Sequence, residues 1–159
     1  MPDNLCNEFI RHFGHSRRGI TDRAAISGAP AVTLPYFAAA LKRYGKPDGD
    51  LHEIRFCAEF SEALKQECGV RGSVDEEAFA VRIDGGRIEV HAPCELGRFH
   101  GAMEVLRMIE QPDINDRLAY ASPLVKLRGL KIYLPAPDEA GFTAFRKLVD
   151  FLARYRCNF

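Results

Sequence analysis

Two consecutive glycines, Gly85 and Gly86, separate two short runs in which apolar and polar residues alternate. A glycine pair takes the positive φ angles of a two-residue hairpin turn at little steric cost. The sequence therefore predicts an antiparallel hairpin with strands over residues 77–83 and 87–92. The predicted register puts three apolar pairs on one face of this hairpin: Phe79 with Ala92, Val81 with Val90, and Ile83 with Ile88. On the other face, Arg82 is expected across from Glu89.

Helical spacing of apolar residues predicts helices before and after the hairpin. Residues 34–44 have Pro35 in the first turn and stop before Gly45, and residues 61–68 are a shorter candidate. An alternating strand is expected over residues 52–59. Residues 95–110 carry an apolar stripe wide enough to pack on a sheet, formed by Leu96, Phe99, Ala102, Met103, Val105, Leu106 and Ile109.

Two glycines interrupt this last helix, Gly97 and Gly101. Each costs about 1 kcal/mol relative to alanine in a helix interior. We expect both to be structural glycines at which another part of the chain approaches closely. The charged residues around them exclude a helix pair inside a membrane.

Two regions give no signal for regular structure. Residues 1–30 are polar and contain glycine and proline, so we expect loops there, and residues 111–123 form a polar link between Pro112 and Pro123. A domain boundary is placed near 119–123. Beyond it we expect a strand over residues 130–134 and a helix over 138–156, capped by Asp138. This helix is expected to bury Phe142, Phe145, Val149 and Leu152.

Composition excludes several classes of function. The chain has 159 residues, with 22 basic residues balancing 22 acidic ones, so no net charge draws it to nucleic acid or to an anionic membrane. No apolar run approaches the ~20 residues of a membrane span, and no signal peptide opens the sequence. Five scattered cysteines indicate neither a disulfide framework nor a zinc site. We expect a cytoplasmic protein, although a signal peptide removed beforehand would leave the same sequence.

Four motifs in the second half of the chain, in this order, resemble glycoside hydrolase family 20, the β-N-acetylhexosaminidases. The paired strands come first, and Gly97–Leu106 resembles the family's glycine-containing helix. Arg128–Leu134 is similar to its Arg-Gly-led first barrel strand, and Lys147–Asn158 to the helix that follows. The resemblance implies a small accessory domain over residues 1–121 and the first β/α unit of a catalytic barrel over residues 122–159.

The expected fold class is therefore α+β, with a mainly antiparallel or mixed sheet, helices chiefly on one face, and a truncated β/α barrel fragment after it. A whole barrel usually needs about 250 residues. The resemblance implies structural roles for Arg128 and Gly129 at the start of the barrel strand. The family's sugar-binding Asp and Arg would fall at Tyr133 and Ala136, where this chain has neither group.

Catalytic candidates are few, and we expect no catalytic residue, cofactor or metal in this chain. The family uses an Asp-Glu dipeptide after the fourth barrel strand, whereas Asp75-Glu76 falls in a predicted loop and Asp138-Glu139 at a helix start, where acidic residues favour the macrodipole. His12 and His15 have a spacing that could put two imidazoles on one helical face, but no third ligand follows. Expected structural roles extend to His91, placed on the exposed face of the hairpin, and to His100.

Two hypotheses of function remain. In the first, the chain is the non-catalytic N-terminal domain of a glycosidase-like protein, and the full-length protein binds carbohydrate. In the second, it is a stand-alone binding module of an inactive relative. Its segment from Arg128 onward would then form homo-oligomers, because a lone strand and helix leave an unpaired edge and an apolar face.

Overall fold

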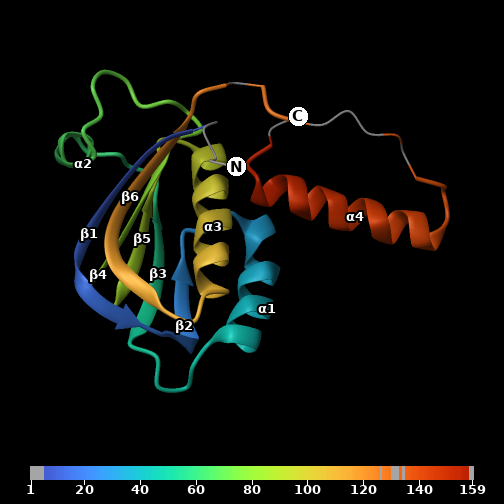
Figure 1. Cartoon of the computed structure of the whole chain (residues 1–159), viewed down its shortest axis with the longest axis horizontal. Coiled ribbons are helices and arrows are strands. Elements are labelled where there is room, and N and C mark those ends of the chain that lie inside the picture. Colours follow the sequence, from blue (N-terminus) through green and yellow to red (C-terminus); the bar gives the residue numbers. More distant parts are fainter. Residues whose placement is uncertain (1–5, 126, 130–132, 134, 158–159) are drawn as a thin grey trace. The chain divides into compact units, whose positions relative to one another are not determined.

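The computed structural model describes residues 6–125, 127–129, 133 and 135–157. The chain divides into two compact units, Met1–Leu124 and Val125–Phe159 (Figure 1). The first unit contains these elements in chain order: β1 (Cys6–Arg18), β2 (Ile20–Ser27), the 3-10 turn η1 (Ala31–Thr33), α1 (Leu34–Tyr44), β3 (Leu51–Cys57), α2 (Glu62–Glu67), β4 (Phe79–Asp84), β5 (Arg87–His91), α3 (Glu95–Ile109) and β6 (Ile114–Pro123). The second unit contains α4 (Glu139–Arg154).

The described strands form one mixed sheet in the order β1-β6-β4-β5-β3-β2. In this order, β1 with β6, β6 with β4, and β4 with β5 are antiparallel pairs. The pairs β5 with β3 and β3 with β2 are parallel. A parallel pair needs a crossover connection, and α1 supplies the one between β2 and β3. The predicted α+β class with a mixed sheet is confirmed.

The hairpin between β4 and β5 has the predicted turn, with φ of 56° at Gly85 and 85° at Gly86. Two of the three expected apolar pairs are confirmed, Val81 with Val90 and Ile83 with Ile88. The third is not part of the ladder, because β5 ends at His91, and Phe79 pairs instead with Ala121 on β6.

Helices α1 and α3 lie along one face of the sheet (Figure 1). Helix α1 has the predicted bounds and buries Phe37 and Leu41, and the Phe37 ring meets Phe56 of β3 edge-on, with centroids 5.9 Å apart. The stripe predicted on α3 is buried from Ala102 onward, whereas Leu96 is exposed and Phe99 is half-buried. This face therefore holds the larger part of the core.

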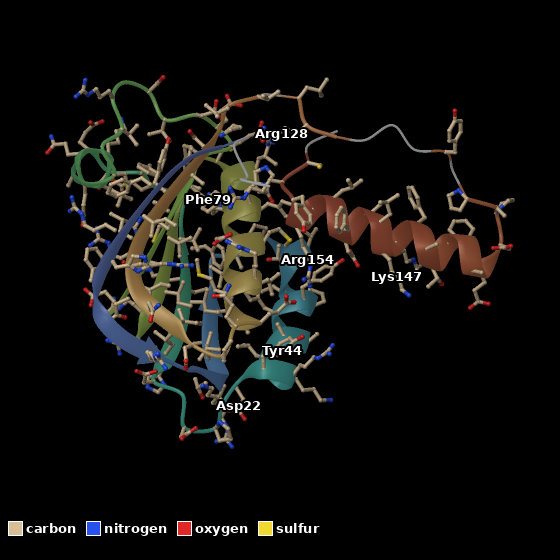
Figure 2. All side chains as sticks on the ribbon, in the orientation of Figure 1. Asp22, Tyr44, Phe79, Arg128, Lys147 and Arg154 are labelled. Carbon is tan, nitrogen blue, oxygen red and sulfur yellow. The ribbon has the colours of Figure 1, made fainter. Side chains whose placement is uncertain are left out.

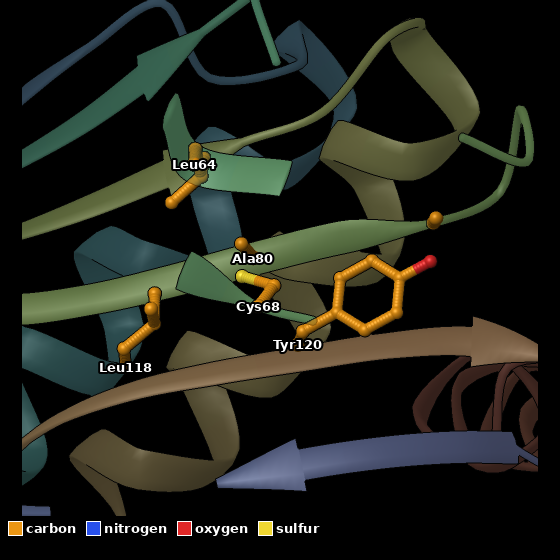
Figure 3. Packing of buried hydrophobic residues seen from close by; sticks show 6 residues of the cluster. Leu64, Cys68, Ala80, Leu118 and Tyr120 are labelled. Carbon is orange, nitrogen blue, oxygen red and sulfur yellow. The ribbon is translucent and has the colours of Figure 1, made fainter. Parts of the chain in front are cut away.

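Helix α2 lies on the opposite face and covers a smaller cluster (Figure 3). Leu64 and Cys68 pack there against Ala80 of β4 and against Leu118 and Tyr120 of β6. Ser61 caps the helix by accepting a hydrogen bond from the Leu64 amide over 3.2 Å. The short helix predicted for this segment is confirmed, and the sheet is packed on both faces.

The expectation of loops over residues 1–30 was wrong, because β1 and β2 occupy most of the described part of that segment. The polar link expected over residues 111–123 was also wrong, since β6 lies between β1 and β4 in the sheet. Its inward positions include Asp116, a buried charge that interrupts the apolar alternation. A strand whose buried face carries a carboxylate resembles a linker when it is read without its partners.

The second unit is described mainly through α4. Asp138 caps this helix as predicted, accepting a hydrogen bond from the Gly141 amide over 2.6 Å. Its expected burial was wrong for Phe142 and Val149, which are 59% and 47% exposed, whereas Phe145 and Leu152 are half-buried. Apart from Tyr133, the strand predicted over residues 130–134 lies outside the described residues.

Candidate functional site

The two Asp-Glu dipeptides lie in separate units, and each aspartate has a local backbone role. The Asp75 carboxylate accepts the Glu77 amide over 2.9 Å, and its carbonyl accepts the Ala78 amide over 3.0 Å. Asp138 is the cap of α4. These contacts are those of a turn and a helix start, and neither presents a proton donor opposite a second carboxylate.

Among the histidines whose burial the structure describes, His100 on α3 is the most deeply buried. Its Nε2 lies 3.2 Å from Oε2 of Glu77, and both side chains are almost fully buried. This contact joins α3 to the turn that precedes β4. Three nearby contacts also hold the start of α3 against the sheet. The Cys94 thiol donates to the Glu76 carbonyl over 2.8 Å, and Gly97 lies against Ala78 and Ala92.

The remaining sequence candidates are dispersed. His91 is half-buried on β5, 3.7 Å from Glu89 Oε2, and its Nδ1 lies 3.3 Å from the Glu59 carbonyl oxygen. His12 and His15 are on strand β1, so their spacing does not put two imidazoles on one helical face. Among the described residues no group of three or more His, Cys, Asp or Glu is arranged to hold a metal ion.

An arginine-centred cluster that the sequence did not predict joins three segments of the first unit. Arg18 at the end of β1 pairs through Nε and Nη2 with the buried Asp116 of β6, with Nη2 2.8 Å from Oδ2. Its Nη1 donates to Asp50 over 3.0 Å, and the other oxygen of Asp50 accepts the Gly19 amide over 3.0 Å. The hydrogen bond to Asp116 is the largest cause of the raised pKa of Arg18.

A second unpredicted cluster lies where α3 covers β6. The buried Glu104 accepts two hydrogen bonds from Arg107, of 2.7 and 3.1 Å, and lies 3.7 Å from Nη2 of Arg117. Burial lowers the pKa of Arg117, and the charge of Glu104 opposes that effect. The Glu104 carboxylate thus contacts two guanidinium groups, and this contact compensates buried charge between α3 and β6.

The sheet face opposite α3 carries charges of alternating sign on three neighbouring strands. Across the sheet, Glu53 neighbours Arg87 and Arg55 neighbours Glu89. The alternation continues onto β4, where Arg87 opposes Asp84 and Glu89 opposes Arg82. Arg82 also has a hydrogen-bonded ion pair with Glu67 of α2, which was not predicted.

Two cysteine thiols on this side of the first unit are poor nucleophiles. Burial raises the pKa of Cys68 to about 11. Cys57 is next to His91 in the parallel register, and burial raises its pKa. The charge of Arg55 opposes this effect, whereas Glu89, Glu59 and Glu53 add to it. A raised thiol pKa leaves little thiolate at neutral pH, so this arrangement does not activate Cys57.

In the second unit, Arg128 binds backbone carbonyl groups. Its Nε donates to the Arg156 carbonyl over 2.8 Å and its Nη1 to the Val125 carbonyl over 2.6 Å. The guanidinium thus joins the beginning of the unit to the last turn after α4. Tyr133 is 92% exposed, and Ala136 uses its carbonyl to accept the Asp138 amide over 2.8 Å. Figure 2 shows Lys147 and Arg154 projecting from α4.

Taken by unit, the described polar clusters join elements of the fold, and they do not assemble an acid and a base around an open site. No described helix is long and apolar enough to cross a membrane. The side chains of these clusters neutralise buried charge and close turns.

Comparisons with known proteins show which solved structures share the fold of this chain. No family model matches the chain, and no curated protein matches it. Among solved structures, CpGH84B aligns with a TM-score of 0.62 and 14% identity over 99% of this chain and 28% of that one. The GH20 exo-β-N-acetylglucosaminidase from Vibrio harveyi, in complex with N-acetylglucosamine, aligns with a TM-score of 0.57 and 16% identity over 94% and 23%. The chitobiase FjGH20 of Flavobacterium johnsoniae aligns with a TM-score of 0.56 and 15% identity over 94% and 25%.

The chain thus has the fold of a part of these glycoside hydrolases and spans about a quarter of the length of each. The structural neighbours agree with the resemblance found in the sequence at this coarser level. Identities of 14–16% carry the fold alone, so activity does not follow from them.

Proposed function

We propose that this chain is the non-catalytic N-terminal part of a glycosidase-like protein related to the β-N-acetylhexosaminidases. Its role there is to support a carbohydrate-hydrolysing barrel that this sequence does not contain. Residues 1–121 form the accessory domain in this proposal, and residues 122–159 contribute the first β/α unit. The observation that carries it is the alignment of 94–99% of this chain with 23–28% of much longer glycoside hydrolases.

The polar contacts support a non-catalytic role. Hydrolysis of an N-acetylhexosaminide assisted by the substrate's acetamido group needs a proton donor and a second carboxylate close to the sugar. Asp75 and Asp138 have backbone partners instead, and they belong to different units. The family's sugar-binding acid and guanidinium are replaced by Tyr133 and Ala136. The substrate class in this proposal is therefore carbohydrate, bound by the parent protein.

An activity assay tests this proposal. The purified chain is incubated with 4-nitrophenyl N-acetyl-β-D-glucosaminide, and release of nitrophenol is followed against buffer. We expect no turnover above background, and the same result for the matched variants Glu76→Gln and Glu139→Gln. Turnover by the wild-type chain that either variant abolishes would overturn the proposal.

Sequencing the gene beyond the Phe159 codon tests whether the chain supports a catalytic barrel in a longer protein. An open frame that encodes further β/α units, with an Asp-Glu dipeptide after the fourth strand, is the expected result. A stop codon at that point would contradict the role as a supporting domain and leave the resemblance as common ancestry.

A second candidate function is self-association through α4. It is favoured by the exposed apolar and aromatic residues of this helix and the turn after it, Phe142, Val149, Phe151 and Tyr155. In this case light scattering of the full chain detects an oligomer that Val149→Lys dissociates and the exposed-surface control Thr143→Lys preserves. A wild-type monomer removes this candidate.

A further inference from the structure

Strand β1 has one long edge without a described partner. It is the end strand of the six, and β6 pairs with its other side. Residues Cys6 to His12 pair one by one with residues 117–123, and the register shifts only between His12 and Arg17. The first half of β1 is therefore a regular strand whose outer backbone groups can pair with another extended chain. The opposite edge strand, β2, is shorter and has an irregularity after Ile20.

In the second half of this regular segment, an apolar residue is flanked by a complementary pair. Ile10 is 50% exposed. Phe9 and Arg11 share the other face of the strand, and the Arg11 guanidinium carbon lies 5.7 Å from the centroid of the Phe9 ring. An arginine and a phenylalanine that attract each other within one strand can do so between two strands as well.

We propose that two copies of this chain pair through β1, antiparallel, about a two-fold axis at Ile10. In this register Ile10 lies opposite Ile10 of the second copy, and Phe9 lies opposite the second copy's Arg11, twice by symmetry. An axis at Arg11 would put two guanidinium groups directly opposite each other. An axis at His12 would bring two imidazoles together. The pattern of residues thus favours a second copy, in one register, as the occupant of this edge.

Light scattering of the full chain, over a concentration series, is the first test. We expect a wild-type mass that rises toward twice the monomer mass. The variant Ile10→Lys puts two ammonium groups at the axis and should give a monomer with an unchanged circular dichroism spectrum. Val32→Lys is the matched control, because Val32 is another exposed aliphatic residue, 66% accessible, away from β1. It should keep the wild-type mass, as should Val149→Lys, which separates this interface from self-association through α4.

Cysteine cross-linking tests the register. Residues directly opposite in an antiparallel pair have Cα atoms about 4.5–5.5 Å apart, within reach of a disulfide. Ile10→Cys should therefore form an intermolecular disulfide at least about tenfold faster than His12→Cys, which this register places opposite residue 8. A wild-type monomer at every concentration, or equal cross-linking by the two variants, would overturn the proposal.

Discussion

Gly97 shows at the scale of one residue how closely α3 approaches the sheet. An ideal Cβ at this position would lie 2.5 Å from the Ala78 carbonyl oxygen and 3.0 Å from Cβ of Ala92. Gly101, one turn later, has similar surroundings, because a Cβ there would lie 2.4 Å from Cγ1 of Val90. The helix can pack this close to β4 and β5 only because Gly97 and Gly101 have no side chain.

The first prediction concerns Gly97→Ala. Alanine is the better helix former by about 1 kcal/mol, yet the clash involves a backbone oxygen that cannot move away alone. We expect the substitution to lower the free energy of unfolding by about 1–3 kcal/mol, measured by urea denaturation. Leu96→Ala, at the exposed neighbouring position, is the control and should change stability by less. A stabilised Gly97→Ala protein would show that the helix has room at this turn.

At the scale of elements, an ion pair joins the small helix α2 to the sheet in addition to its apolar cluster. The sequence predicted a cross-strand pair of Arg82 with Glu89, and the two residues do lie opposite each other. The hydrogen-bonded partner of Arg82 is nevertheless Glu67 at the end of α2. Glu89 instead lies 3.6 Å from Arg87 and 3.7 Å from His91.

A pair of double-mutant cycles measures this difference. We expect Arg82 and Glu67 to have a coupling free energy of about 0.5–1 kcal/mol, since each side chain is only 29% exposed. The cycle for Arg82 with Glu89 should give a smaller value. Alanine variants and chemical denaturation supply both numbers, and a larger coupling to Glu89 would restore the pair that the sequence suggested.

At the scale of the whole molecule, the two units differ in how much of their apolar surface is buried. Strands β4 and β6 have neighbours on both sides and carry fully buried residues such as Val81, Ile83 and Leu118. Helix α4 leaves Phe142 and Val149 largely exposed. Elements with few buried apolar contacts open at a lower free-energy cost than the core does.

Hydrogen exchange followed by mass spectrometry checks this contrast. Peptides from β4 and β6 should exchange at least about tenfold more slowly than peptides from α4 under native conditions. The full-length chain is used at low concentration so that self-association does not protect α4. Equal protection of α4 and the central strands would mean that this helix is buried in solution.

The accuracy of the sequence-based predictions depended on whether the determining contacts are local. Helix α1 has its predicted bounds because a proline in the first turn and Gly45 after the last mark its ends. The hairpin followed from Gly85 and Gly86 between two runs of alternating apolar and polar residues. Strand β6 was missed because its buried Asp116 is compensated by Arg18, 98 residues away in sequence. The same separation hid the cluster around Arg18 from the search for a site, and the cluster around Glu104 was missed because Arg117 lies on another element, β6.

The sequence by itself determined the helices, the hairpin register and the α+β class, because caps, turns and periodicity act within a few residues. It also indicated the resemblance to glycoside hydrolase family 20. Only the tertiary structure decided that β1, β2 and β6 complete the sheet and that Arg82 pairs with Glu67. Those outcomes depend on contacts between distant segments, which neutralise buried charges and pair strand edges only after the chain has folded.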